Sequence, residues 1–154
     1  MSAGYELVDH TADIGVHAWG ATPEQVFEEA ARAGLPTEVA MTDAVFNLGR
    51  TPLVVEALRT GDYALLSQVM DDRLHQASRL KRIPGARTAW LAAQNAGAAA
   101  VAVSGSGPSL IAFVSLATDA SRIARVMAEA FAAEGVTAIP LGLAASAAGA
   151  TVAV

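Results

Sequence analysis

The chain has 154 residues, a net charge of −5 and no cysteine. This length suits one domain with its own core, and we expect a single domain over 1–154. The acidic balance argues against affinity for nucleic acid or acidic membranes. The absence of cysteine excludes disulfides and thiolate metal sites. We expect a cytoplasmic protein, because neither a signal peptide nor a bilayer-spanning run is visible. Hydrophobic residues make up 53% of the sequence, which favours surface buried against a partner or a second copy.

The N-terminal residues predict two short extended segments followed by a helix. The segments cover 5–8 and 14–19. Thr22 is typical of an N-cap, Pro23 suits the first helical position, and Gln25 stands where a capping box places its second polar residue. We expect this helix to stop at Gly34.

Apolar residues at helical spacing predict three helices in the middle of the chain. They cover 43–60, a stretch that restarts at Gly61-Asp62, and 87–96, which Gly97 ends. Pro52 should kink or split the first of them, since it removes a backbone donor. The expected core residues of these helices are Val45, Leu48, Leu53, Val54, Leu65, Leu66, Val69, Met70, Leu74, Trp90 and Leu91.

A loop rich in serine and glycine lies between two short apolar runs, 101–103 and 110–114. The loop is too short for a crossover helix, so we expect two antiparallel strands of one sheet. Glycine backbone and serine hydroxyls in such a loop suit an anion or a carboxylate. A plain turn explains the same composition. The loop residues that carry the binding hypothesis are Ser104, Gly105, Ser106, Gly107 and Ser109.

A helix capped by Thr118 or Asp119 should follow and end at Gly135, before strands over 136–143 and 150–154. The resulting order is strand, several helices, two hairpin strands, helix and strand. It predicts an α+β fold with a ferredoxin-like antiparallel sheet packed with helices, and extra helices in the first crossover.

From about residue 31 to residue 154 the chain resembles the C-terminal half of the homoserine kinases, which belong to the GHMP small-molecule kinases. The similarity is specific because several pieces occur in the family's order and at nearly its spacing. The matching pieces are Arg32-Ala33-Gly34-Leu35-Pro36, Asp43-Ala44-Val45-Phe46-Asn47, Asp72-Arg73-Leu74-His75-Gln76, Arg79, Ile83-Pro84-Gly85, Ser104-Gly105-Ser106-Gly107-Pro108-Ser109, Leu141-Gly142-Leu143-Ala144 and Gly149-Ala150.

This resemblance implies the acceptor-side half of an ATP-dependent phosphotransferase. It also implies that Arg32 and Arg79 bind an anionic ligand, with the 104–109 loop closing over the same pocket. The ligand would be a small, homoserine-like amino acid, bound by its carboxylate, or a phosphate. The alternative is that both arginines are solvated charges on helix faces and bind no ligand. The ATP phosphate loop is absent from the sequence, so we expect no catalysis by this chain alone. ATP and Mg²⁺ belong only to a complete kinase, and the implied partner is a nucleotide-binding half or a second copy of the chain.

Over about residues 4–31 the chain resembles archease, a metal-binding accessory protein of tRNA ligation, and the matching stretch is 5–20 with the helix after it. The resemblance offers Asp9 and Asp13 as oxygen ligands for a divalent cation. Capping of the turn between the two extended segments is the alternative role for both side chains. The two resemblances together indicate a fused or chimeric chain, natural or engineered. A scaffold that binds no ligand is the third reading.

Overall fold

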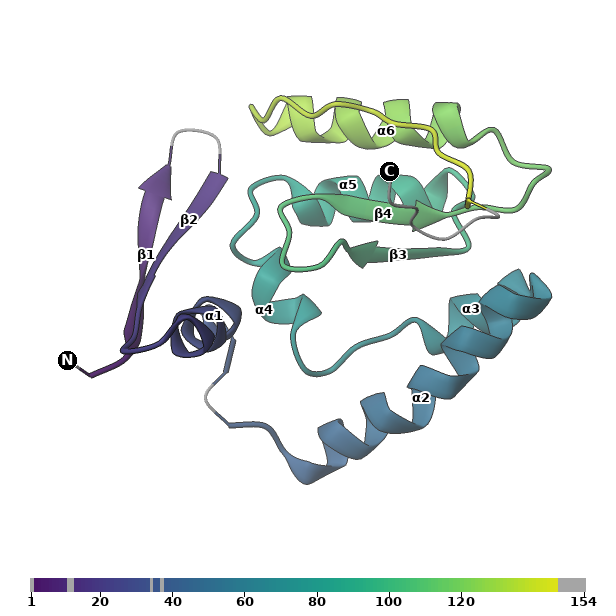
Figure 1. Cartoon of the computed structure of the whole chain (residues 1–154). Helices are drawn as coiled ribbons and strands as arrows, with labels where there is room; N and C mark the ends of the chain where they lie inside the picture. The colour runs from purple at the N-terminus through teal and green to yellow at the C-terminus, as the bar shows by residue number, and fades with distance from the viewer. Residues whose placement is uncertain (1, 11–12, 34, 37, 147–154) are drawn as a thin grey trace, which may run out of the picture.

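The computed structural model describes residues 2–10, 13–33, 35–36 and 38–146, and gives the backbone alone for 7–10, 13–15 and 31. It is a mixed α+β structure, drawn in Figure 1. The elements in chain order are β1 (Gly4–His10), β2 (Asp13–Trp19), α1 (Pro23–Arg32), α2 (Met41–Thr60), α3 (Tyr63–Val69), α4 (Gln76–Leu80), α5 (Ala86–Asn95), β3 (Ala100–Val103), β4 (Leu110–Phe113) and α6 (Ala120–Ala133).

The N-terminal lobe consists of the β1–β2 hairpin with α1 packed against it (Figure 1). The hairpin register places Gly4 opposite Trp19. A Cβ at Gly4 would stand 2.8 Å from the Trp19 ring, so glycine leaves room for the indole. The predicted helix start is confirmed: Thr22 accepts from the Gln25 N–H at 3.4 Å, and Gln25 Oε1 accepts from the Ala21 N–H at 2.8 Å.

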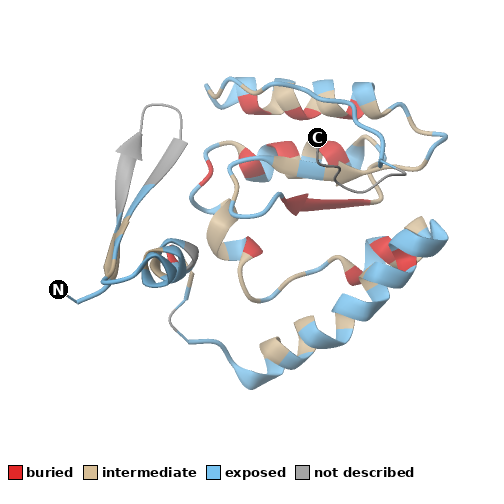
Figure 2. Ribbon diagram, viewed as in Figure 1, coloured by how far each residue is buried: buried red, intermediate tan, exposed pale blue. Residues whose placement is uncertain are grey.

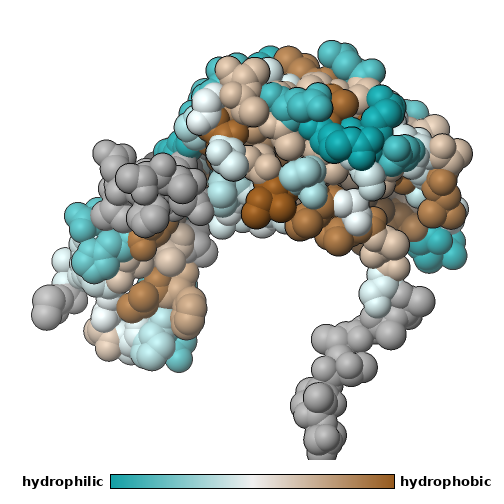
Figure 3. Space-filling view, turned by 90° about the horizontal axis from the view of Figure 1, so that it is seen from above, coloured by the Kyte–Doolittle hydropathy of each residue, from teal (hydrophilic) through white to brown (hydrophobic). Residues whose placement is uncertain are grey.

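Seen from above, this lobe lies beside the main body, whose face over α6 mixes hydrophilic and hydrophobic residues (Figure 3).

The main core lies between the β3–β4 hairpin, α5 and α6 (Figure 2). The predicted antiparallel pairing is confirmed, with Val101 opposite Ala112. All four residues of β3 are buried. Alanines on α5 let this helix approach β3 and α6 closely, since they present little side-chain volume. The buried residues of this core are Ile83, Ala86, Ala89, Ala93, Val101, Val103, Ile123, Met127 and Phe131.

Helices α2 and α3 form an arm that joins the main body through a second, smaller core. Ala57, Leu66 and Ala100 make this core and so attach the arm to β3. Gly61 ends α2 in the left-handed conformation, and Asp62 caps α3 by accepting from the Leu65 N–H at 2.8 Å. Pro52 does not split α2, which is one helix of 20 residues.

The predicted ferredoxin-like sheet is not formed by the described residues, which contain two separate sheets of two strands each. Residues 136–143 have no regular secondary structure, although a strand was expected there. Val136 and Ala138 still pack against the core, whereas Ile139 is 82% exposed. Pro140 offers no backbone N–H to a ladder, which explains why a segment that lies along the core does not pair. The strand predicted over 150–154 lies outside the described residues.

The predicted core is only partly correct along α2. Leu66 and Val69 of α3 are buried as expected. Val45, Leu48 and Leu53 of α2 are exposed, because the α2 contacts within the described chain leave their side uncovered. Leu91 of α5 is also exposed, while Trp90 is half-buried.

Candidate functional site

The loop between β3 and β4 is closed by its own backbone. The Ser104 N–H donates to the Ser109 carbonyl at 2.8 Å, and the Gly107 N–H donates to the Ser104 carbonyl at 3.0 Å. Gly105 and Gly107 both have positive φ, at 59° and 87°. These conformations favour glycine, so the loop shape follows directly from its composition.

Gly107 is also held by close packing. A Cβ there would stand 2.8 Å from Ile83 Cδ1, whereas a Cβ at Gly105 would meet nothing within 4 Å. We therefore expect Gly107→Ala to lower the free energy of unfolding by about 2 kcal/mol and Gly105→Ala by about 1 kcal/mol. Urea unfolding of the two variants measures the difference. Equal losses would mean that the approach to Ile83 is unimportant.

Helix α4 is tied to the hairpin at two points. Gln76, which is buried, accepts from the Val103 N–H at 2.8 Å through Oε1. Arg79 donates from Nη1 to the Ser106 carbonyl at 3.1 Å. This bond uses one of the five N–H donors of a guanidinium and leaves the planar fork beside the loop. Arg79 and the loop are thus brought together, as the resemblance implied.

Asp72 fixes the start of α4. Its Oδ1 accepts from the N–H groups of Leu74, His75 and Gln76 at 3.0, 2.7 and 2.8 Å. Its Oδ2 accepts from Asn47 Nδ2 at 2.6 Å, which links α4 to α2. Burial on its own raises the pKa of this carboxyl, but the N–H donors of Gln76 and His75, the Asn47 amide and the His75 ring together hold the pKa below 3.8.

The inner side of α2 carries a stacked group of cations around Phe46. The Arg50 guanidinium lies 3.3 Å and that of Arg73 lies 3.7 Å from the ring centroid. Arg73 also pairs with Asp43 at 3.6 Å. Arg50 Nε and, beside Asp72, His75 Nδ1 are buried without a hydrogen-bond partner. These contacts hold the 71–75 segment against α2, so Arg50 and Arg73 have a structural role.

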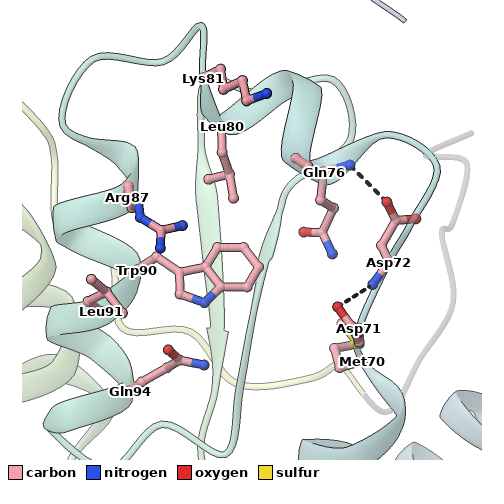
Figure 4. A pocket seen from close by; sticks show the side chains of 11 residues that line it. Met70, Asp71, Asp72, Gln76, Leu80, Lys81, Arg87, Trp90, Leu91 and Gln94 are labelled. Atoms are coloured by element: carbon pink, nitrogen blue, oxygen red, sulfur yellow. Dashed lines mark hydrogen bonds between the residues drawn. The ribbon is translucent and has the colours of Figure 1, made fainter. Parts of the chain in front are cut away.

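A cavity of about 670 Å³ opens between the 70–77 segment and α5. The Trp90 indole projects into it, with Leu80 across from the ring and Arg87 beside it (Figure 4). Gln76 and Leu80 line this cavity, whereas Arg79 of the same helix bonds to the 104–109 loop. The predicted site residues therefore do not line the cavity. Its lining residues are Met70, Asp71, Asp72, Gln76, Ala77, Leu80, Lys81, Arg87, Trp90, Leu91 and Gln94.

The other predicted site residues lie apart from Arg79. Arg32, at the end of α1, is exposed and forms ion pairs with Glu29 at 3.1 Å and Glu28 at 3.9 Å within its own helix. This is the arrangement of a solvated helix-face charge. The side chains of Asp9 and Asp13 lie outside the described residues. Among the side chains that are described, no group of three or more histidines and carboxylates could hold a metal ion.

Sequence reasoning placed Asp72 and Gln76 in a matching motif but gave neither a role. The role of Asp72 has a signal in the sequence, because an aspartate shortly before a short helix is typical of a helix cap. The buried bond of Gln76 has no local signal, because its partner Val103 is 27 residues away.

The fold agrees with a solved structure found among known proteins. A family model for the GHMP kinases C-terminal region matches residues 54–133. The chain belongs to the GHMP kinases, C-terminal family. A model for the archease protein family matches residues 5–85, so the N-terminal half belongs to that family as well. The archease match extends well beyond the opening segment that suggested it.

Homoserine kinases are among the relatives and solved structures that match. The enzyme of Moorella thermoacetica is 45% identical over 105 residues, which are 68% of this chain and 35% of the relative. That of Desulfitobacterium hafniense is 43% identical over 110 residues, or 71% of this chain and 37% of the relative. The crystal structure of homoserine kinase from Cytophaga hutchinsonii matches with a TM-score of 0.62 and 34% identity, covering 68% of this chain and 33% of that one. The chain thus spans about a third of the length of its relatives. None of the described helices is both long and apolar enough to cross a membrane.

Proposed function

We propose that this chain is the acceptor-side half of a homoserine-kinase-like phosphotransferase. It binds the carboxylate of a small amino acid at Arg79 and the 104–109 loop. The observation that carries the proposal is the bond from Arg79 Nη1 to the Ser106 carbonyl, which holds a guanidinium fork beside a loop of glycine and serine. The similarity to homoserine kinases over 68% of the chain supports the same substrate class.

Phosphoryl transfer requires a second component under this proposal. The reaction depends on positioning and charge neutralisation around the ATP phosphates and Mg²⁺. The 104–109 loop is followed by a strand and not by a helix, so it does not open the helix that a phosphate-binding loop normally precedes. We therefore assign ATP and Mg²⁺ to a separate nucleotide-binding half. The order β3, β4, α6 corresponds to the two middle strands and the second helix of a ferredoxin-like layout, which we propose for the assembled enzyme.

Homoserine should raise the melting temperature of the chain through Arg79, because a ligand that binds only the folded state stabilises it. At a homoserine concentration near 100 times the dissociation constant, the gain is about 2.7 kcal/mol. We expect Arg79→Ala to abolish the shift and Arg79→Lys to weaken it, since lysine lacks the planar fork. Arg125→Ala is the matched control, as it removes an arginine of α6 that pairs with Asp119. A shift that survives in Arg79→Ala would contradict the proposal.

A second candidate function rests on the archease match over residues 5–85. In this reading the N-terminal lobe binds a divalent cation through Asp9 and Asp13. Calorimetry with Ca²⁺ and Mg²⁺ tests it directly. Heat that is lost in Asp9→Ala would support metal binding, and the absence of heat at millimolar metal would remove this candidate.

A further inference from the structure

The cavity between the 70–77 segment and α5 is separate from the proposed acceptor site. Leu80 lines the cavity, whereas Arg79, the residue before it, donates to the Ser106 carbonyl of the 104–109 loop. The cavity volume of about 670 Å³ falls within the range of roughly 300–1,000 Å³ that is typical of small-molecule sites. The cavity therefore has room for a ligand that the proposed function does not use.

The walls of this cavity are held in place by the protein itself. Gln76 is 8% exposed and accepts from the Val103 N–H at 2.8 Å, which fixes α4 to β3. On the α5 side, Ala89 and Ala93 are fully buried in the main core, so the helix that carries Trp90 is fixed as well. A ligand thus meets a preformed site, and little free energy is lost in ordering the walls.

The Trp90 indole offers a flat apolar surface inside the cavity. The side chain is half-buried and projects into the cavity, with Leu80 across from the ring (Figure 4). Met70 and Leu91 add further apolar lining. A planar ring that lies against the indole gains dispersion contacts over its whole face, and offset stacking of two aromatic rings is favourable. The lining therefore favours an aromatic ligand over a linear, polar one.

The charged side chains of the cavity are divided between its two ends. Lys81 and Arg87 lie toward one end and Asp71 toward the other, with Trp90 between them (Figure 4). Neither cation takes part in the ion pairs that form among the described residues. A guanidinium binds a carboxylate through two parallel hydrogen bonds, and an ammonium adds a second positive charge. The cationic end is therefore suited to a carboxylate.

The acidic end is suited to a hydrogen-bond donor. Asp71 Oδ1 accepts from the Asp72 N–H at 3.0 Å, which leaves Oδ2 as an acceptor for a ligand. Asp72 also lines the cavity, but its carboxylate bonds to backbone N–H groups of the 74–76 segment and to the Asn47 amide. An amine or hydroxyl of a ligand would thus be bound by Asp71.

We propose that this cavity binds a planar aromatic acid. The ring lies against Trp90, the carboxylate binds Arg87 and Lys81, and an amine or hydroxyl at the far end of the ring donates to Asp71. The inference goes beyond the proposed function and does not depend on it, because these residues are not part of the acceptor site. The competing occupant, a segment of the nucleotide-binding half that fills the cavity, predicts no saturable binding of such an acid by the chain alone.

The indole N–H signal of Trp90 allows a direct test, since the chain contains one other tryptophan, Trp19. The probe is para-aminobenzoate, which carries a carboxylate and an amine at opposite ends of one ring. In proton–nitrogen correlation spectra, the Trp90 signal should shift and saturate at millimolar probe, while the Trp19 signal stays in place. Trp19→Phe assigns the two signals. A Trp90 signal that does not move, or equal shifts of both signals, would overturn the proposal.

Two analogues of the probe separate the contributions of charge and ring. Neutral para-aminobenzamide should bind about tenfold more weakly, because it cannot form the charge-assisted bonds to Arg87 and Lys81. The saturated analogue, aminocyclohexanecarboxylate, should bind about fivefold more weakly, because it has no flat face for Trp90. Equal affinities of the acid and the amide would mean that the cations do not bind the carboxylate, and the proposal would be wrong.

Substitutions of exposed cations provide the last comparison. Arg87→Gln should weaken binding of para-aminobenzoate about tenfold, and Arg125→Gln, which removes an arginine of α6 outside the cavity, should have no effect. Saturating homoserine should also leave the affinity unchanged, which distinguishes this site from the acceptor site at Arg79. Unchanged affinity in Arg87→Gln, an equal loss in Arg125→Gln, or competition by homoserine would each contradict the proposal.

Discussion

Replacement of Asp72 by alanine should lower the free energy of unfolding by about 3 kcal/mol. The substitution leaves the N–H groups of Leu74, His75 and Gln76 without their acceptor and removes the bond from Asn47 to this carboxylate. Losing a helix cap costs about 1 kcal/mol, and the half-buried donors that lose their acceptor add to this cost. Asp71→Ala is the control, since this exposed neighbour accepts one bond, from the Asp72 N–H, and should cost less than about 1 kcal/mol. Urea unfolding of both variants provides the comparison.

The Asp72 carboxylate should also make the free energy of unfolding depend on pH in the acid range. Its pKa in the folded chain lies below the ordinary value of 3.8. The contribution is therefore fully present above pH values near 4 and is lost as the pH falls through the lower, folded-state pKa. The difference in unfolding free energy between the native chain and Asp72→Ala should be constant from pH 5 to 7 and shrink below pH 4. A difference that grows on acidification would mean that the pKa shift has the opposite sign.

Ile123→Ala should be the most destabilising change in the main core, at about 3–4 kcal/mol. Ile123 is 1% exposed and packs among residues of α5, α6 and the hairpin, so truncation removes buried surface and leaves a cavity. Ile139 offers a matched control, because it is the same residue type at 82% exposure. Ile139→Ala should change the unfolding free energy by less than about 0.5 kcal/mol. Comparable losses of unfolding free energy in the two variants would mean that Ile123 does not belong to the main core.

Local sequence signals predicted the local structure well. The Thr22 cap, the hairpin around the 104–109 loop and the Asp119 cap all follow from short-range chemistry, and all are confirmed. Asp119, for example, accepts from the Arg122 N–H at 3.1 Å. Such features depend on residues within one turn of each other, and the sequence contains the whole interaction.

Features that depend on distant partners were predicted less well. The apolar spacing of α2 was interpreted as a core face, because a periodic stripe does not reveal whether anything covers it. Pairing of residues 136–143 into a larger sheet was wrong because the apolar run contains Pro140 and pairing also requires a neighbouring edge. At the site, the binding role of the loop was predicted from its glycine and serine content, and that of Arg79 from similarity to a family, and both stay predictions. The roles of Asp72 and Gln76 became visible once α4 was seen against α2 and β3.

The central proposal is that this chain binds the acceptor and that another half binds the nucleotide. Titration calorimetry of the chain with homoserine, and separately with ATP and Mg²⁺, tests it most directly. We expect saturable heat with homoserine that disappears in Arg79→Ala, and no heat with the nucleotide. Tight binding of ATP by this chain, or no homoserine heat at millimolar concentration, would contradict the assignment of an acceptor-side half.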